Sequence, residues 1–417
     1  MAKLQPVRGT HDLLPADARR HQYIIAQFRE IAERYNYGQI ETPIFEFTEV
    51  FNRTLGETTD VVTKEMYTFE DRSGDSLTLR PEHTAGIARA FISGGLAQNL
   101  PLKFYSFGPM FRHERPQKGR QRQFHQLDVE ILGVAEPQAD IEVIALGAHL
   151  FEALGLADKV TLELNTLGDS ESRQAYRNVL IEYFTDHRAD LSEEAQERLG
   201  RNPLRILDSK DRKDRSVVEG APAMSAHLNA ASTDFFQAVT EGLDALNIAY
   251  QRNEKLVRGF DYYTHTAFEF TTELLGAQSA VLAGGRYDGL IESMGGQPTP
   301  GIGWGSGIER LEMLLDIPVE AARPVVVVPV GEAAAKAGLI LLQELRHAGV
   351  TADMGAKGNV GKRMKQANKA KASHVVLLGD DEIEQGVVSL RDLDSGEQSE
   401  VARADIVGRM ANGKSNS

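Results

Sequence analysis

Two strand-like runs that flank a charged loop constrain the fold of this chain more than any other feature. Residues 103–112 and 123–132 read as strands, and the ten residues between them, HERPQKGRQR, contain a proline and a glycine. A polar connection of this kind between two strand-like runs predicts a β-hairpin, here with a long basic tip. The first part of the chain is therefore expected to contain an antiparallel sheet.

The order of strand-like and helix-like patterns divides the 417 residues into two predicted domains. Over 1–320 most strands precede the helices, which favours an α+β domain. A polar, helix-biased stretch over about 170–250 is predicted to be a helical insertion in that domain. From 323 to 417, continuous apolar runs such as PVVVVPV alternate with helical patterns, so a small α/β domain with its sheet covered on both faces is expected.

The N-terminal region shows a helix signal followed by a strand signal. Pro15 suits the first turn of a helix, and apolar residues then recur at helical spacing at Ile24, Phe28, Ile31 and Tyr35. Residues 39–47 read as one strand, and Pro43 inside it predicts a position at an edge or an interface.

Several common chemistries are excluded by the motifs. The pair His113-Glu114 begins like a zinc-protease helix, but residue 117 is Gln rather than the second His. The chain has no GxxxxGK[ST] phosphate loop, no GxSxG nucleophile elbow and no cysteine. If the chain is an enzyme, it is expected to work by electrostatic positioning rather than by covalent or metal chemistry.

Composition predicts a cytoplasmic protein that does not enter a membrane. No apolar run approaches the roughly 20 residues that span a bilayer, and the N-terminus lacks the layout of a secretory signal. The net charge of −14 argues against non-specific coating of nucleic acid. However, residues 357–371 hold six basic residues and no acid, so this run is either a solvated helix face or a contact with RNA phosphates.

The second strand of the hairpin carries a row of polar residues. Side chains alternate along a strand, so Gln126, Asp128 and Glu130 share one face. Five cations precede this row: Arg112, Arg115, Lys118, Arg120 and Arg122. The polar row either faces water or forms the floor of a cleft for a small polar ligand, with the arginines at its rim holding phosphates.

Three other segments carry candidate binding residues. Glu82 and Thr84 either hold an ammonium group or only start a helix after Pro81. The run Val257–Tyr263 places an arginine near two adjacent tyrosines, and it is either a binding strand or an interface strand. Arg310 follows the alternating glycines of GIGWGSG at the start of a helix, where anions bind well; alternate glycines also let a flat ligand lie close to a strand.

Taken in order, these segments resemble the motifs of bacterial histidyl-tRNA synthetases, which belong to the class II aminoacyl-tRNA synthetases. The resemblance runs from about residue 6 to about residue 400. The segments that carry it are RGTHDLLP (8–15), TLRPEHT (78–84), FRHERPQKGRQRQFHQLDVEILG (111–133), LVRGFDYYT (256–264), AGGRYDGL (283–290) and GIGWGSGIERL (301–311). The hairpin is similar to motif 2 of the class and the glycine strand with its helix to motif 3.

The resemblance implies a class II antiparallel-sheet catalytic domain over 1–320 and an anticodon-binding domain over 323–417. The side chains that it assigns to the α-ammonium group of L-histidine are Glu82, Thr84 and Gln126. Those that it assigns to the imidazole pocket are Glu130, Tyr262 and Tyr263. Those that it assigns to ATP are Arg112, Arg120 and Arg310, and Arg258 is placed with Arg112 at the reacting centre.

The implied reaction has two steps. The histidine carboxylate attacks the α-phosphorus of ATP to give histidyl-adenylate and pyrophosphate, and the histidyl group then passes to the 3′ end of tRNA(His). Mg²⁺ is expected with ATP, although its ligands are not identified, and the family implies a homodimer. The expected tRNA contacts in the basic run are Lys357, Lys362, Arg363 and Lys365.

The alternative is a non-catalytic, synthetase-like regulatory subunit of ATP phosphoribosyltransferase. Such paralogues generally lack the C-terminal domain and have eroded motifs, whereas this chain retains Arg112, Arg258 and Arg310. Two positions depart from the family pattern. His83 stands where a small or apolar residue is expected and could alter that loop, and Trp304 could reshape the platform for adenine.

Overall fold

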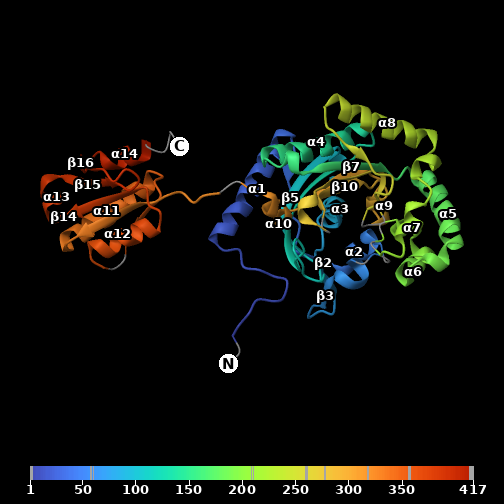
Figure 1. The fold of residues 1–417 in the computed structure, drawn as a ribbon, viewed down its shortest axis with the longest axis horizontal. Helices are drawn as coiled ribbons and strands as arrows, with labels where there is room; N and C mark the ends of the chain where they lie inside the picture. The colour runs from blue at the N-terminus through green and yellow to red at the C-terminus, as the bar shows by residue number, and fades with distance from the viewer. Residues whose placement is uncertain are drawn as a thin grey trace. The chain divides into compact units, whose positions relative to one another are not determined.

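The structure is a computed structural model. It describes residues 3–56, 59, 61–207, 209, 211–258, 262–276, 279–316, 319–355 and 358–412. The chain forms two compact units, Met1–Val319 and Glu320–Ser417 (Figure 1). Within the described ranges no helix has the length and apolar character needed to cross a membrane.

The first unit is built on an eight-stranded sheet. Its strands, in spatial order, are β1 (Gly38–Gln39), β5 (Leu102–Phe111), β6 (Gln123–Leu132), β11 (Gly301–Gly307), β10 (Ala280–Arg286), β9 (Thr264–Thr271), β7 (Thr161–Thr166) and β8 (Gln251–Arg252). All neighbours are antiparallel except the outer pairs β1–β5 and β7–β8. The predicted hairpin is confirmed, with Phe111 opposite Gln123 where the strands meet the connecting loop.

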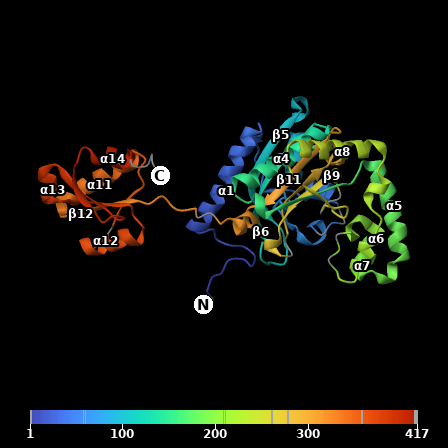
Figure 2. The same cartoon turned by 45° about the horizontal axis from the view of Figure 1, so that its top comes forward.

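Helices cover one face of this sheet. They are α1 (Pro15–Arg34), α4 (Pro137–Ala153), α8 (Ala230–Ala245) and α10 (Ile308–Leu314), and α1, α4 and α8 lie along the same side of the strands in Figure 2. The helix predicted from the apolar spacing near the N-terminus is confirmed. Its Ile24, Phe28 and Ile31 are buried in the core that these helices share with the sheet. Trp304, the only tryptophan of the chain, lies in the same core.

A second, three-stranded sheet is built from residues between 45 and 79. It has the order β2 (Phe45–Phe47), β4 (Ser76–Leu79), β3 (Tyr67–Glu70). The prediction of one strand over 39–47 was wrong: β1 ends at Gln39 and β2 begins at Phe45, in different sheets. Pro43 lies between them, and a proline cannot donate a hydrogen bond to a strand ladder. The remaining short elements near this sheet are α2 (Thr48–Leu55), η1 (Val61–Glu65), α3 (Thr84–Ser93), η2 (Leu96–Asn99) and α9 (Leu290–Ser293).

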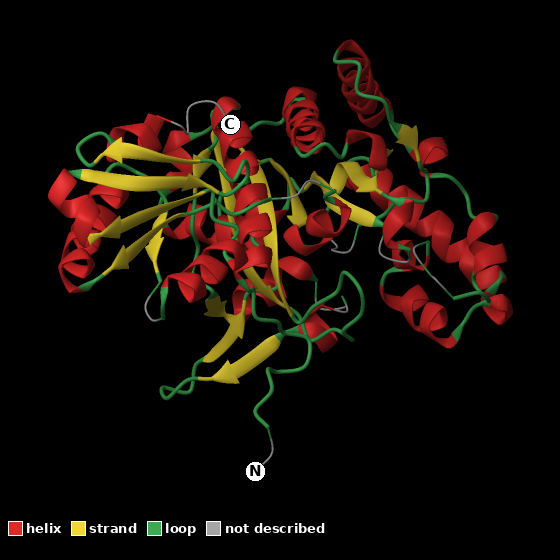
Figure 3. Ribbon diagram, turned by 60° about the vertical axis from the view of Figure 1, so that its left-hand side comes forward, coloured by secondary structure: helices red, strands yellow, loops and turns green. Residues whose placement is uncertain are grey.

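The segment after β7 is helical and has a core of its own. Its elements are α5 (Ser170–Asp186), η4 (Arg188–Asp190), α6 (Glu193–Arg201), η5 (Pro203–Ile206), α7 (Arg215–Glu219) and η6 (Met224–His227), drawn as helices joined by loops in Figure 3. Residues such as Tyr176, Leu180 and Phe184 pack together there, away from the main core. Helix α8 is different, because its Phe236, Val239 and Leu243 join the main core.

The second unit is a five-stranded mixed sheet. Its order is β13 (Ala352–Met354), β12 (Val325–Val330), β14 (His374–Gly379), β15 (Val387–Asp392) and β16 (Gln398–Ala402), with the first three parallel and the last two antiparallel. Val325 and Val327 belong to one apolar cluster, whereas Val326 and Val328 belong to another. Both faces are therefore covered, as predicted. The covering helices are α11 (Glu332–His347), α12 (Val360–Lys369), α13 (Asp380–Gln385) and α14 (Ile406–Asn412).

A buried ion pair ties α4 to the end of β10. Arg286 and Asp140 are both fully buried and bonded to each other. Arg286 also donates to the carbonyl oxygens of Val134, at 2.9 Å, and Glu136, at 3.2 Å. The arginine of the AGGRYDGL segment is therefore part of the scaffold, and it holds the helix that packs behind the glycine strand.

Asp140→Ala should lower the free energy of unfolding by about 3–5 kcal/mol, because it leaves the Arg286 charge buried without its partner. Fluorescence of Trp304 during urea denaturation reports this, since that side chain lies in the core of the first unit. As a control, Arg34→Ala breaks an exposed pair with Glu30 on α1 and should cost less than about 1 kcal/mol. Equal costs for the two variants would contradict the role given to Arg286.

Candidate active site

A cavity of about 920 Å³ opens on the face of the main sheet opposite the helices. The predicted site residues that line it are Glu82, Thr84, Arg112, Arg120, Gln126, Arg258, Tyr262, Tyr263 and Arg310. Glu130 is not among the lining residues and is almost fully buried. The structure therefore brings residues from four segments of the sequence to one place.

The alternating glycines of β11 make room for polar side chains rather than for a ligand alone. A Cβ atom on Gly303 would overlap the carboxylate of Glu130, and one on Gly305 would overlap the amide of Gln126. The side chains of β6 thus lie flat across the neighbouring strand. Any larger residue on this face of β11 would displace the floor of the cavity.

A hydrogen-bond network holds Glu130 beneath the cavity. Its carboxylate accepts from the hydroxyl of Thr84, at 2.5 Å, and from the hydroxyl of Tyr287. Burial raises the pKa of Glu130 to about 8, although the bonds from Thr84 and Tyr287 favour its ionised form. Glu130 therefore orients two hydroxyl groups that border the space above it.

Glu82 lies two residues before helix α3 and caps its first turn. Its carboxylate accepts from the backbone N–H groups of Thr84 and Ala85, each at 2.7 Å. Burial raises the pKa of Glu82, and these backbone bonds oppose that change. Glu82 can start the helix and still bind an ammonium group, because each carboxylate oxygen can accept a second hydrogen bond from a ligand.

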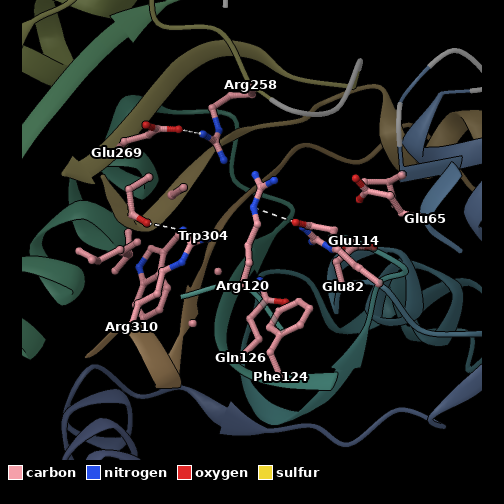
Figure 4. A pocket seen from close by; sticks show the side chains of 18 of the residues that line it. Glu65, Glu82, Glu114, Arg120, Phe124, Gln126, Arg258, Glu269, Trp304 and Arg310 are labelled. Carbon is pink, nitrogen blue, oxygen red and sulfur yellow. Dashed lines mark hydrogen bonds and ion pairs between the residues drawn. The ribbon is translucent and has the colours of Figure 1, made fainter. Parts of the chain in front are cut away.

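Arginines gather at the other part of the cavity (Figure 4). Arg258 forms an ion pair with Glu269, and Arg120 forms one with Glu114 at 2.7 Å. Arg310 donates to the backbone oxygen of Ala280 at 2.6 Å. The pKa of Arg310 is lowered by burial and then by the charges of Arg120 and Arg112. Guanidinium groups that repel one another in this way form a site for a polyanion.

Arg112 is held between the hairpin and the start of α3. Its Nε donates to the carbonyl oxygen of Pro81 at 2.9 Å, and its guanidinium lies 5.3 Å from the ring centre of Phe124. Phe124 was not singled out in the sequence, since aromatic residues in strands usually pack in cores. Here it provides a flat face at the cavity wall.

Two further acidic residues, Glu309 and Asp128, were not among the site residues predicted from the sequence. Glu309 accepts from the backbone N–H of His125, at 2.9 and 3.0 Å, and lies 2.9 Å from its Nδ1. The start of α10 is thereby attached to β6. Asp128 lines the cavity between Gln126 and Glu130 and is 2% exposed. The alternation along β6 already placed Asp128 on this face.

The two departures from the family pattern are both buried. Trp304 donates from Nε1 to the carbonyl oxygen of Val143 at 2.8 Å and packs against Phe28, so its indole belongs to the helix-covered face. His83 is fully buried, with Nδ1 at 3.3 Å from the hydroxyl of Ser106. Burial and the charge of Arg80 lower the pKa of His83 well below its usual value, so this ring is neutral.

The helical insertion forms one wall of the cavity. Its lining residues are Glu194, Arg198, Arg205, Ser209 and Asp211. These side chains face the same space as the residues of the main sheet. The insertion therefore borders the site, which its sequence alone did not indicate.

The basic residues of the second unit divide into two kinds. Lys362 and Lys365 on α12 are exposed, whereas Arg363 is half-buried and donates to the backbone oxygen of Pro329 at 2.7 Å. Lys357 lies outside the described residues. Lys362 and Lys365 are accessible to a partner, and Arg363 attaches the helix to the sheet.

Comparison with known proteins decides the family. A family model described as histidyl-tRNA synthetase matches residues 9–311, and one described as anticodon binding domain matches residues 324–412. The chain belongs to the histidyl-tRNA synthetase family. The Rhodospirillum rubrum histidine–tRNA ligase is 59% identical over 97% of this chain and 98% of its own length. The Gluconacetobacter diazotrophicus enzyme of the same name is 55% identical over 96% and 97%.

A solved structure agrees with this membership. The apo histidyl-tRNA synthetase of S. aureus has a TM-score of 0.83 at 34% identity, over 99% of this chain and 100% of that one. The expected synthetase fold is confirmed. The regulatory-subunit alternative is not favoured, because the relatives that match at high identity over nearly the whole chain carry the name of the ligase.

Gly303→Ala should raise the Kd of this synthetase for L-histidine at least about tenfold, because the added methyl group displaces the Glu130 carboxylate. Isothermal titration calorimetry with the amino acid alone measures this. Gly200→Ala is a matched control, since a Cβ atom there meets nothing within 4 Å, and it should leave the Kd unchanged. An unaltered Kd in Gly303→Ala would show that the floor of the cavity is not the amino-acid site.

Proposed function

We propose that the chain activates L-histidine with ATP to form histidyl-adenylate and pyrophosphate, and then transfers the histidyl group to the 3′ end of tRNA(His). One observation carries this proposal. A single cavity has carboxyl groups at one part, on β6 and α3, and clustered guanidinium groups at another. An amino acid and a nucleoside triphosphate have the complementary charges.

The amino-acid end of the cavity suits a zwitterion with a polar ring. Glu82, Thr84 and Gln126 are proposed to hold the α-ammonium group, and Glu130 and Tyr263 the imidazole, with Tyr262 beside them. The hydroxyls of Tyr262 and Tyr263 lie 3.4 Å apart. A buried site of matched hydrogen-bonding groups rejects amino acids that lack the imidazole, because its polar groups would then be left unpaired.

The ATP end is proposed to act by alignment and neutralisation of charge. Arg112 holds the α-phosphate, Arg258 stands at the reacting carboxylate and phosphorus, and Arg120 and Arg310 hold the outer phosphates. Displacement at phosphorus spreads negative charge over the equatorial oxygens, so fixed cations stabilise the transition state more than the ground state. Arg258 is poised for this by Glu269, whose charge raises its pKa against the effect of burial.

Mg²⁺ is part of the proposal as a companion of ATP. It is usually held by one or two carboxylates together with substrate phosphates. Glu114 and Glu269 line the phosphate part of the cavity and offer such oxygens. When bound, the ion neutralises phosphate charge, while the arginines supply orientation.

The second unit is proposed to bind the anticodon region of tRNA(His) through the exposed lysines of α12. Its match to an anticodon-binding model supports this. Lys357 and Arg363 remain part of the proposed surface, although Arg363 is also engaged with Pro329. A cytoplasmic location fits a chain without cysteine.

A homodimer is also proposed. Large apolar side chains of the small sheet and the loop before it are exposed in the single chain: Ile44, Phe45, Phe47 and Phe69. Exposed apolar residues in one region mark surfaces that bind another protein. A second copy of this chain, joined at about residues 18–46, which resemble the dimer-forming motif 1 of the class II synthetases, would cover them.

The decisive test is ATP–pyrophosphate exchange that depends on L-histidine. The purified protein should show exchange with L-histidine and background exchange with other amino acids. Absence of exchange in folded protein would overturn the proposal. Charging of tRNA(His) then tests the second step separately.

Arg258→Ala should lower kcat for exchange by about 10²–10³, because the variant loses a preorganised cation at the reacting centre. The same assay with histidine and ATP at saturation measures it. Arg252→Ala removes an exposed arginine nearby in the sequence and should keep near-normal exchange. Turnover within about threefold of wild type in Arg258→Ala would refute its placement.

The double change Lys362→Ala and Lys365→Ala should raise KM for tRNA about tenfold and leave pyrophosphate exchange unaltered, since it removes two phosphate contacts far from the chemistry in the sequence. The effect should shrink as salt is added. Lys336→Ala, an exposed lysine on α11, is the control. Loss of exchange in the double variant would mean that α12 supports the fold instead.

A further inference from the structure

The proposed roles give no task to Asp128, a buried carboxyl group that lines the cavity. It lies on β6 between Ser106 of β5 and Gly305 of β11. The side chain is 2% exposed, yet it lines the cavity. Its Oδ1 atom is buried and accepts no hydrogen bond from any described residue. A buried acceptor left unpaired costs free energy, so this oxygen needs a donor that the described part of the chain does not provide.

A second unpaired acceptor lies next to it. The Oε1 atom of Gln126 is also buried and has no hydrogen-bond partner among the residues that the structure describes. Residues two apart on a strand project from the same face at roughly 7 Å, so one small group between them can reach both. That group has to offer at least two N–H or O–H donors. An ammonium group has three and accepts none.

Charged groups face Asp128 from each element packed around it. Glu130 comes from the same strand, Glu82 from the residues just before α3, Arg80 from just after β4 and Tyr287 from just after β10. Burial, followed by the charges of Glu130 and Glu82, raises the pKa of Asp128 well above its usual value, while Arg80 opposes this.

Arg80 offsets the rise in the pKa of Asp128 only in part, and its guanidinium is engaged elsewhere. Its guanidinium donates to the backbone oxygens of Thr42, at 2.8 Å, and Pro109, at 3.0 Å. Among the described residues, none of the ion pairs involves Glu82, Asp128 or Glu130. Nor is any group of three acidic or histidine residues in the described chain placed to hold a metal ion. The missing cation is therefore expected to arrive with a ligand.

Asp128 and Glu130 are both buried and lie two residues apart on the same face of β6. Burial raises the pKa of both carboxyl groups, and a hydrogen bond between them adds to this rise for Asp128 and opposes it for Glu130. Such a bond requires that one of the two groups be protonated. An arriving cation favours the doubly ionised pair and displaces this proton.

We propose that Asp128 is a second carboxylate ligand of the α-ammonium group of histidine, with Gln126, and that histidine binding releases the proton shared by Asp128 and Glu130. This rests on the proposed function of the cavity. On binding, the ammonium group keeps its three hydrogens and donates to Asp128 Oδ1 and Gln126 Oε1. The shared proton passes to solvent, and no covalent bond changes.

Asp128→Asn tests the assignment, because the amide keeps the size of the carboxyl group and loses its charge. The variant should bind L-histidine and histidinol about tenfold to a hundredfold more weakly, since both carry the ammonium group. It should bind 4-methylimidazole, which has the ring alone, within about twofold of wild type. Calorimetry with each compound gives the three Kd values.

Proton release is the second readout. Titration of L-histidine at about pH 7.5 in phosphate and in Tris, which differ in ionisation enthalpy, counts protons released on binding. Wild type should release up to about one proton, and Asp128→Asn clearly less. Ser106→Ala, which changes the neighbour of Asp128 across the strands without touching a charge, should match wild type in both readouts.

A folding defect is distinguishable from this role. A carboxyl whose folded pKa is raised destabilises the fold above its unfolded pKa, so Asp128→Asn should melt at the same or a higher temperature at neutral pH. Equal Kd values and equal proton release in wild type and variant would overturn the inference. So would an equal loss for 4-methylimidazole, which would place Asp128 at the ring. If wild type binds no histidine at all, the proposed function itself fails.

Discussion

The rest of the first unit depends on the two faces of strand β6. Leu127, Val129 and Ile131 point into the helix-covered core. Gln126, Asp128 and Glu130 alternate with them and face the neighbouring glycines and the cavity. A strand can carry polar groups on one side and anchor a core on the other only if the neighbouring strands add apolar side chains to the core and leave room on the polar face. Strand β5 supplies Tyr105 to the core, and β11 supplies glycines to the polar face.

This arrangement separates charges within one cavity. Acidic side chains lie over β6 and at the start of α3, where burial raises their pKa values. Guanidinium groups lie toward the hairpin loop and α10, where they repel one another. Each cluster brings several groups of one charge type close together, so each favours a ligand of the opposite sign. The free energy spent in burying these groups is returned when both substrates are bound.

Local patterns predicted much of the fold and part of the site. The hairpin, helix α1 and the two-sided sheet of the second unit followed from spacing, because periodicity reports directly on which face is buried. The strand expected over 39–47 failed, since strand-like composition on both sides of Pro43 does not say that two sheets are involved. The family resemblance brought Gln126 and Glu130 together with Arg258, but passed over Asp128. Sequence alone also left open where Trp304 and Glu309 point, because their partners Val143 and His125 are more than a hundred residues away.

The bond between Glu309 and His125 has a geometric consequence. Strand β6 carries the side chains proposed for the amino acid, and helix α10 carries Arg310, proposed for the triphosphate. Because Glu309 accepts from the backbone of β6, the two supports are joined directly by hydrogen bonds. The separation between the two substrates is then a property of the empty protein. Their reacting atoms meet without either substrate having to search for the other, which is the entropic advantage of a preassembled template.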